Sequence, residues 1–359
     1  MATIDAGHDV TLISSDGPET QWLASIPGVK FREIEIPRKI SFLRDLHALW
    51  QLYWFFRREK FDIVHSITPK AGMLCAVAGV FARVPVRLHT FTGQAWVELS
   101  GLVRSVAKAG DWLTAHLVTL CYADSFSQRD FLISQGICDP ERIRVPGSGS
   151  LAGVDIERFN PDKWEGTREA TRGELSIPEG AKVIAFIGRI TRDKGIEELL
   201  AAFDMLLQQG QNCVLLLIGP EDAADGTLSN SKRRSDGNIR YIGYSAEPGK
   251  YLAVSDVFCL PSYREGFGNV VIEAAAMGVP SVGTDIVGLR DSISNGETGL
   301  LVPAKDVRTL ADALMKLLED EELRSAMGKK AMHRAKTEFD AKRVNAAVLE
   351  EYARLMQDS

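Results

Sequence analysis

Two patterns of hydrophobicity alternate along the chain, and they restrict its fold more than any other feature. Short apolar runs typical of buried strands occupy 9–15, 61–67, 85–91, 123–127 and 142–148, and later 182–188, 213–219, 239–244, 257–262, 280–285 and 299–303. Longer stretches with helical spacing lie between them, as at 40–58, 104–121, 196–208 and 306–319. A chain that alternates strands and helices in this way forms parallel sheets covered by helices on both faces.

The alternation is interrupted once, at residues 151–169, where "LAGVDIERFNPDKWEGTRE" combines Gly, Pro and charge without an apolar period. A chain of 359 residues is too long for one ordinary core. We therefore predict an α/β protein of two Rossmann-like, doubly wound domains that face a cleft. They are an N-terminal domain at 1–155, a C-terminal domain at 156–338, and a helix at 339–359 that packs back on the first domain. Ligands bind such sheets beyond the carboxyl ends of the strands.

Composition excludes several classes of protein. The net charge of −6 argues against a nucleic-acid binder that relies on broad basic charge. The five cysteines are scattered and form no C-x-x-C pair, which is typical of free thiols in a reducing cytosol. The longest apolar run, 71–82, is too short to span a bilayer, and the first residues lack the pattern of a signal peptide. We expect a cytoplasmic protein.

The segment "YREGFGNVVIEAAAMGVPSVGTD" (263–285) places Glu265 in a loop and Glu273 inside a helix that Asn269 is expected to cap and that Gly278 ends. A helix N-terminus attracts phosphate, and a carboxylate accepts hydrogen bonds from sugar hydroxyls. The segment thus fits a diphosphate flanked by sugars. These residues alone leave a second interpretation open, in which Glu273 complements the helix dipole and Glu265 is solvated.

A second segment, "VIAFIGRITRDKGIEELLAAF" (183–203), places Arg189 and Lys194 after a strand of the same domain. Such cations neutralise a diphosphate leaving group. The sequence contains no Asp-x-Asp pair that would hold a metal for this purpose, so we expect no metal and no cofactor. The alternative is that both cations lie on a solvated loop. The absence of G-x-G-x-x-G argues against a dehydrogenase.

Together, "FIGRITRDKG" (186–195) and residues 263–285 resemble the donor-binding domain of the retaining glycosyltransferases of family four, which have the two-domain GT-B fold. "NGETGLLVP" (295–303) and "GVDIERFNP" (153–161) are also similar to that family. The resemblance covers most of the chain, from about residue 6. Glu265 and Glu273 fit the family pattern Glu-x7-Glu.

The resemblance implies a role for each residue of these segments. Glu265 would hold hydroxyls of the donor sugar, Glu273 the ribose hydroxyls, and Arg189 with Lys194 the diphosphate. Other residues of the two loops would line the donor site: Gly188, Gly266, Phe267, Gly268, Asn269 and Val270. Strand ends would flank the nucleobase at Gly219, Tyr241, Ile242 and Tyr244. The implied reaction is sugar transfer with retention from a nucleotide-diphosphate donor, such as a UDP-hexose or a UDP-N-acetylhexosamine.

The first domain is expected to supply the acceptor side. His89 lies at the end of the strand in "VRLHTFTGQAWV" (86–97), where it could position the transferred sugar or the departing phosphate. A lone histidine is often structural. "HTFTGQ" is similar to a subset of the family that builds capsule, O-antigen or other glycan precursors on undecaprenyl diphosphate, which implies a lipid-linked sugar as the acceptor.

Residues 38–60, "RKISFLRDLHALWQLYWFFRREK", combine several aromatic side chains with basic residues at both ends. This is more apolar surface than one buried stripe needs, and it suits an anionic membrane face. We expect peripheral contact with the cytoplasmic face of the inner membrane. The alternative, that the helix is simply buried against the first sheet, stays open.

The chain departs from the family at its start. Family members begin with a strand, a Gly-containing loop and a helix that ends near "AGHDV", whereas Met1 falls inside that helix. We therefore expect the first sheet to be interrupted and the first domain weakened, with low or no transfer activity. Two rival functions remain: a nucleotide-binding homologue without turnover, and a glycosidase that uses Glu265 and Glu273 as acid and base.

Overall fold

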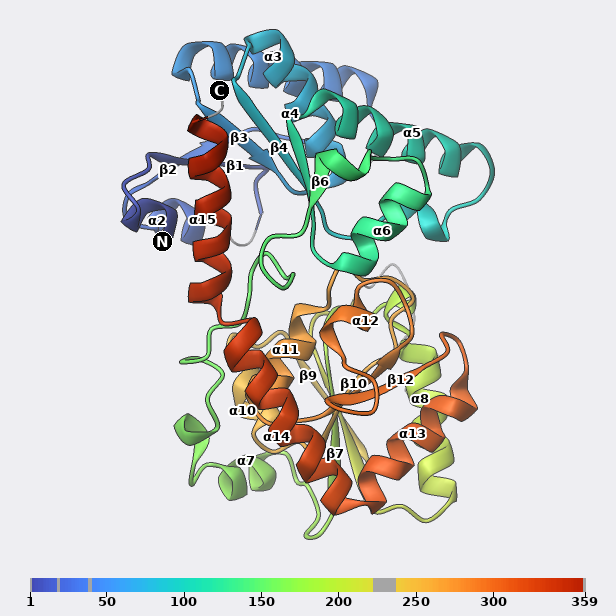
Figure 1. Ribbon diagram of the computed structural model, residues 1–359. Coiled ribbons are helices and arrows are strands. Elements are labelled where there is room, and N and C mark those ends of the chain that lie inside the picture. The colour runs from blue at the N-terminus through green and yellow to red at the C-terminus, as the bar shows by residue number, and fades with distance from the viewer. Residues whose placement is uncertain (1, 18–19, 38–40, 222–236, 358–359) are drawn as a thin grey trace. The chain divides into compact units, whose positions relative to one another are not determined.

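The computed structural model describes residues 2–17, 20–37, 41–221 and 237–357 (Figure 1). The chain forms two compact units. Unit 1 comprises Met1–Leu151 together with Lys342–Ser359, and unit 2 comprises Ala152–Ala341. The sequence placed the boundaries at 155/156 and 338/339. Both units are α/β, and every paired strand is parallel to its neighbour, as the alternating pattern predicts.

Unit 2 contains a six-stranded sheet in the order β12-β11-β10-β7-β8-β9. Its strands are β7 (Lys182–Ile187), β8 (Cys213–Ile218), β9 (Ile239–Gly243), β10 (Val257–Leu260), β11 (Ser281–Thr284) and β12 (Gly299–Val302). Its helices are α7 (Arg168–Glu174), α8 (Ile196–Gln208), α10 (Pro248–Leu252), α11 (Asn269–Ala276), α12 (Leu289–Ser292), α13 (Val307–Glu319) and α14 (Glu321–Glu338), with short 3-10 turns η3 (Pro161–Trp164) and η4 (Arg192–Lys194).

The strands of unit 2 are apolar because helices cover both faces of the sheet. All six residues of β8 and five of the six in β7 are buried. Figure 1 shows α8 and α13 on one side of the sheet and α10, α11 and α14 on the other. A strand buried on both faces has no solvent side for polar residues, so it reads as a continuous apolar run. The six strands predicted for this half are all present.

Unit 1 contains two separate parallel sheets. β1 (Val10–Ser14) pairs with β2 (Val29–Glu33), and the second sheet has the order β3-β4-β5-β6. The strands of the second sheet are β3 (Ile63–Ser66), β4 (Val86–Phe91), β5 (Leu120–Ala123) and β6 (Ile143–Arg144). The helices of unit 1 are α1 (Ala2–Asp5), α2 (Thr20–Ser25), α3 (Phe42–Glu59), α4 (Pro69–Ala82), α5 (Gly101–Leu117), α6 (Phe126–Ser134) and α15 (Ala341–Gln357), with the 3-10 turns η1 (Ala95–Glu98) and η2 (Pro140–Arg142).

The interruption expected in the first sheet is present among the described residues, since β1–β2 and β3–β6 share no ladder. Met1, on which that expectation was based, lies outside the described residues, as do residues 38–40 of the predicted membrane segment. β2 was not predicted; its residues are exposed or only partly buried, so its sequence carries little apolar signal.

Two further predictions were wrong in detail. The strand predicted at 123–127 is β5, Leu120–Ala123, because Ser125 instead caps α6: its hydroxyl accepts the Gln128 N–H at 3.2 Å. The stretch predicted as a linker belongs to unit 2 apart from its first residue, Leu151, and its Val154 and Phe159 enter the hydrophobic core of unit 2.

The C-terminal helix α15 belongs to unit 1 apart from its first residue, Ala341. Tyr352 packs with the core residues of β4 and β5, and its hydroxyl lies 2.5 Å from His65 Nδ1 on β3. Glu351 accepts a charged hydrogen bond from Arg144 on β6 at 3.0 Å. In unit 2, Val154 N–H donates to Phe339 O and Ala341 N–H donates to Val154 O, so the two connections between the units run side by side there.

Candidate active site

Two loops at the carboxyl ends of neighbouring strands meet in unit 2. The loop after β7 carries Arg189 and Lys194, and the loop after β10 carries Glu265. Gly195 ends η4 with φ +69°, and a Cβ at this position would lie 2.0 Å from Pro261 O. Only glycine allows this approach, so Gly195 brings Lys194 against the loop after β10.

Lys194 and Glu265 form an ion pair with 2.6 Å between Nζ and Oε1. Their side chains are only 18% and 14% exposed, so water screens the pair weakly. The Ser262 hydroxyl donates to the same carboxylate oxygen at 2.8 Å. The structure therefore joins two residues that lie 71 positions apart in the sequence.

Asp193, next to Lys194 in the sequence, forms ion pairs with two guanidinium groups. Its Oδ2 lies 4.0 Å from Arg189 Nη2 and 3.7 Å from Arg264 Nη2, and its Oδ1 accepts a hydrogen bond from the Thr191 hydroxyl at 2.5 Å. Sequence reasoning missed Arg264 and Asp193. The signal was present, because both residues adjoin predicted site residues and carry opposite charges, but their contact requires two loops that the sequence does not place together.

The helix of the Glu-x7-Glu segment is α11, and its N-terminus differs from the prediction. Gly268, with φ +83°, is the N-cap residue, and Asn269 is already the first helical residue. The Val271 N–H donates to Gly268 O at 2.8 Å, so this donor of the first turn is already used within the protein. Gly266, Phe267 and Gly268 are buried, whereas Asn269 is exposed and Val270 is half-buried at the start of the helix.

Glu273 lies in the second turn of α11 and is half-buried. Burial raises the pKa of its carboxyl from the ordinary 4.5 to about 7, and the nearby Arg158 guanidinium opposes this rise. Arg158 itself donates to Ala246 O at 2.6 Å. The carboxyl is thus divided between its neutral and ionised forms near neutral pH. Sequence reasoning did not single out Arg158.

The residues proposed to flank the nucleobase follow β8 and end β9. Gly219 N–H donates to Gly243 O at 2.7 Å, and a Cβ on Gly219 would lie 1.9 Å from Gly188 O. The loops after β7 and β8 therefore touch through two glycines. Tyr241 and Ile242 are half-buried, whereas Tyr244 is 75% exposed.

His89 belongs to unit 1, unlike the other candidate residues. It is buried on β4, where its Nδ1 lies 2.9 Å from Ser66 Oγ and its ring meets Phe91 edge-to-face. A Cβ on Gly72 of α4 would lie 2.4 Å from the ring, so glycine makes room for it. Burial, with a smaller effect of His65, lowers the pKa of His89 to about 3. The ring is therefore neutral at physiological pH and acts as a hydrogen-bonding group rather than a cation.

Comparison with known families decides the identity of this architecture. Residues 2–149 match the model of the glycosyl transferase 4-like domain, and residues 167–334 match the model of the glycosyl transferases group 1. The capsular polysaccharide biosynthesis glycosyltransferase CapM of Staphylococcus aureus is 32% identical over 341 residues, which is 93% of this chain and 86% of CapM. The chain belongs to glycosyltransferase family four. It is a hexosyltransferase, as the sequence predicts.

Other relatives agree with this assignment. The UDP-Gal:α-D-GlcNAc-diphosphoundecaprenol α-1,3-galactosyltransferase of Escherichia coli is 28% identical over 335 residues, covering 88% of this chain and 81% of that one. Among solved structures, sucrose-phosphate synthase of Thermosynechococcus elongatus superposes with a TM-score of 0.85 at 21% identity, covering 100% and 92% of the two chains. HepE of Anabaena, solved with UDP and glucose, has a TM-score of 0.82 at 18% identity, covering 98% and 94%. These structures confirm the GT-B fold of the glycosyltransferase.

Proposed function

We propose that this glycosyltransferase transfers a hexose or N-acetylhexosamine, with retention at the anomeric carbon, from a UDP-linked donor to a lipid-linked glycan precursor. The observation that carries the proposal is the convergence of Lys194 and Glu265 beside Arg189 in unit 2. A diphosphate needs cations, and a sugar needs a carboxylate that accepts its hydroxyl protons. A glycosidase needs no cations of this kind, and the family membership argues against that rival.

The ion pair suggests how donor binding and transfer are coupled. Lys194 would contact the diphosphate while its bond to Glu265 holds that carboxylate toward the sugar. The acceptor hydroxyl attacks the anomeric carbon on the face from which the diphosphate leaves. The bond from that carbon to the phosphate oxygen breaks, the bond to the acceptor oxygen forms, and the phosphate oxygen takes the acceptor proton. Arg189 and Lys194 stabilise the charge that develops on the phosphate.

Roles for the remaining residues follow the same proposal. Glu273 would accept hydrogen bonds from the ribose hydroxyls, and the backbone at Gly268, Asn269 and Val270 would meet the phosphates at the N-terminus of α11. In unit 1, neutral His89 would hydrogen-bond the transferred sugar or the leaving phosphate. We propose that the reaction needs no metal ion.

The relatives support the nature of the acceptor. CapM is named for capsular polysaccharide biosynthesis, and the Escherichia coli relative is named for a diphosphoundecaprenol-linked acceptor and a UDP-linked donor. We propose an undecaprenyl-diphosphate-linked sugar as the acceptor here. A screen of UDP-sugars against such an acceptor, read as the mass of the lipid product, tests the proposal. Binding of UDP without transfer to any acceptor would favour the rival homologue that lacks turnover.

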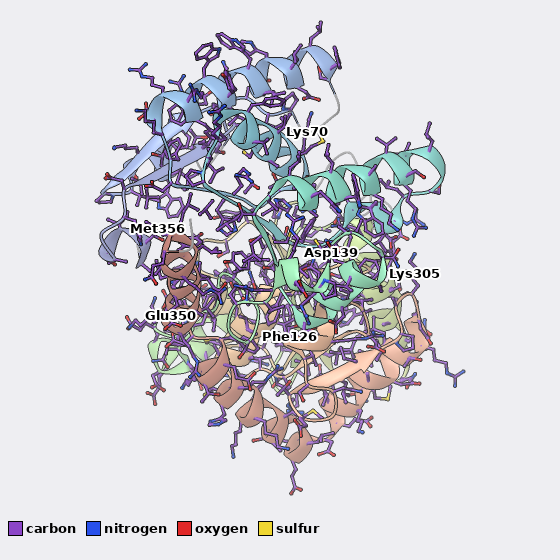
Figure 2. The ribbon with its side chains drawn as sticks, turned by 45° about the horizontal axis from the view of Figure 1, so that its top comes forward. Lys70, Phe126, Asp139, Lys305, Glu350 and Met356 are labelled. Atoms are coloured by element: carbon purple, nitrogen blue, oxygen red, sulfur yellow. The ribbon has the colours of Figure 1, made fainter. Side chains whose placement is uncertain are left out.

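We also propose that unit 1 contacts the cytoplasmic face of the inner membrane through α3. Among the described residues, no helix combines the length and apolarity needed to cross a bilayer. α3 packs on unit 1 through Ala48, Leu52 and Phe56. A second set of large apolar side chains on α3 is more than half exposed: Phe42, Leu43, Leu46, Trp50 and Trp54. Figure 2 shows side chains on the outer side of α3 projecting away from unit 1.

A combined variant tests the membrane contact. Changing Trp50 and Trp54 to Ser and Arg57 and Arg58 to Glu removes apolar surface and reverses charge on α3 without touching its buried stripe. The variant should stay folded and no longer sediment with anionic vesicles. Retained binding, or loss of folding, would contradict the proposed role of α3.

A further inference from the structure

Tyr263 lies directly before Arg264 and Glu265 in the loop after β10, and it holds this loop to the segment after β7 in two ways. Its backbone N–H donates to Asp193 O at 2.9 Å. Its hydroxyl donates at 2.5 Å to Oε1 of Glu198, which lies in the first turn of α8. Neither Tyr263 nor Glu198 has a role in the proposed transfer step.

A third segment of unit 2 also reaches Tyr263. Lys305 follows β12, and its Nζ lies 4.4 Å from the centroid of the Tyr263 ring, within the range of a cation–π interaction. The backbone of Lys305 has φ +65°, a conformation that residues other than glycine adopt uncommonly. Because β7, β10 and β12 belong to one parallel sheet, the segments that follow them lie at the same edge, where ligands bind such sheets. Tyr263 thus connects three segments at the edge that carries the candidate active site.

The polar pair of Tyr263 and Glu198 is not explained by stability alone. Replacing both partners of a buried hydrogen bond by apolar groups of the same shape is nearly neutral for folding. In addition, Glu198 Oε2 is buried and has no hydrogen-bond partner among the described residues, which costs folding free energy. Burial and the hydrogen bond to Glu198 raise the pKa of Tyr263, so its hydroxyl keeps the proton and stays the donor. The hydrogen bond therefore fixes the orientation of Tyr263, which apolar packing would leave adjustable.

The place of Tyr263 determines where the next two side chains lie. Glu265 pairs with Lys194 at 2.6 Å, and Arg264 lies 3.7 Å from Asp193. Both partners belong to the segment after β7 that Tyr263 contacts through its backbone. A relative shift of about 1 Å between the two loops would disrupt contacts of this length, and a misplacement of that size can slow a reaction about 100-fold.

We propose that Tyr263 is a positioning residue for the transfer reaction: held by Glu198, it fixes the loop after β10 so that Glu265 stays beside Lys194 at the donor sugar. This inference rests on the proposed function, in which Glu265 contacts that sugar. Tyr263 and Glu198 touch no substrate and act through Glu265. Hydrogen bonds of this kind, behind the groups that contact the substrate, hold an active site in its productive geometry.

The first test is Tyr263→Phe, which removes a single oxygen atom and keeps the ring. It should lower kcat roughly tenfold or more and leave the Kd of UDP within about twofold, because Arg189 and Glu273 stay in place. Tyr251→Phe on α10 is the matched control, since Tyr251 is also a half-buried tyrosine of unit 2, and it should behave like the wild type. An unchanged kcat, an equal loss in the control, or a loss of UDP affinity as large as the loss of kcat would overturn the proposal.

The second test changes the acceptor of the hydrogen bond. Glu198→Gln keeps an oxygen at the place of Oε1 and should retain kcat within about threefold, whereas Glu198→Leu should lose roughly tenfold or more. Because the two residues act as one unit, Tyr263→Phe combined with Glu198→Leu should be no slower than Glu198→Leu alone, within about twofold. Equal losses in Glu198→Gln and Glu198→Leu, or losses that multiply in the double variant, would refute positioning through this hydrogen bond.

A third measurement needs no turnover. Hydrogen exchange of the protein without substrate, read by mass spectrometry on peptides that cover 189–195 and 261–268, reports on the contact between the two loops. Tyr263→Phe should speed exchange there roughly fivefold or more and leave β8 unchanged. Equal exchange in both proteins, or faster exchange that includes β8, would overturn the proposal. A wild type that transfers no sugar would contradict the proposed function, and the exchange result would still decide whether Tyr263 holds the loops together.

Discussion

Removal of either partner of the Lys194–Glu265 pair should destabilise unit 2, because the other partner is left as a partly buried charge without its counter-ion. At 2.6 Å, with an effective dielectric constant of about 20, the Coulomb attraction is roughly 6 kcal/mol before the cost of desolvating both groups. Breaking a fully buried pair costs about 3–5 kcal/mol, and this pair retains some exposure. We expect Lys194→Met and Glu265→Gln each to lower the free energy of unfolding by about 2–3 kcal/mol. In Lys194→Met, Glu265 keeps the Ser262 hydroxyl as a donor.

The double variant gives the sharper result. Lys194→Met with Glu265→Gln leaves no unpaired charge, so the double variant should lose about as much free energy of unfolding as one single variant. The coupling energy between the two residues should then be about 2 kcal/mol. Urea denaturation of all four proteins measures this coupling. Arg189→Gln serves as the control, because its side chain is 55% exposed and 4.0 Å from Asp193. It should cost at most about 1 kcal/mol. Losses that add within about 0.5 kcal/mol would refute the coupled pair.

Three other predictions follow from the structure. Burial raises the pKa of Glu273 from 4.5 to about 7, so its contribution to stability should be complete below pH 4.5 and lost as the pH rises to about 7. Glu273→Gln should flatten that part of the plot of unfolding free energy against pH, and an unchanged plot would contradict the raised pKa. Arg189→Ala and Lys194→Ala should each cost the transfer reaction about 3–4 kcal/mol of transition-state stabilisation. The transfer activity of the wild type should survive EDTA; a loss of activity that Mg²⁺ or Mn²⁺ restores would exclude the metal-free reaction. Amides of β1 should exchange hydrogen faster than those of β8, since β1 is only half-buried and belongs to a two-stranded sheet; equal protection would show that the break in the sheet does not weaken unit 1.

The sequence predicted the parts of the fold in which one local pattern has one physical outcome. β7 and β8 are continuous apolar runs because both of their faces are covered, and α8 has the periodicity of a helix with one buried side. The strand β5 was misplaced because Leu120 and Cys121 continue the apolar spacing of α5 without an obvious break. The two elements are separated where the backbone becomes extended at Val118, directly after the last helical residue of α5, Leu117.

The contacts between the site residues could not be predicted from neighbouring residues in the sequence. Glu265 and Lys194 could be selected as residue types, but their ion pair depends on the approach of Gly195 to Pro261 across two loops. Arg264 and Asp193 were missed for the same reason. The raised pKa of Glu273 reflects its burial in the folded unit, which no neighbouring residue in the sequence reveals.

We propose that unit 2 binds a UDP-linked donor with separate carboxylates for its two sugars. Calorimetric titration of UDP into the wild type, Glu273→Ala and Glu265→Ala tests it most directly. We predict that the wild type binds UDP, that Glu265→Ala binds it with similar affinity, and that Glu273→Ala binds it roughly tenfold or more weakly, because only Glu273 is proposed to contact the ribose. No heat from the wild type, or equal weakening in both variants, would contradict the assignment.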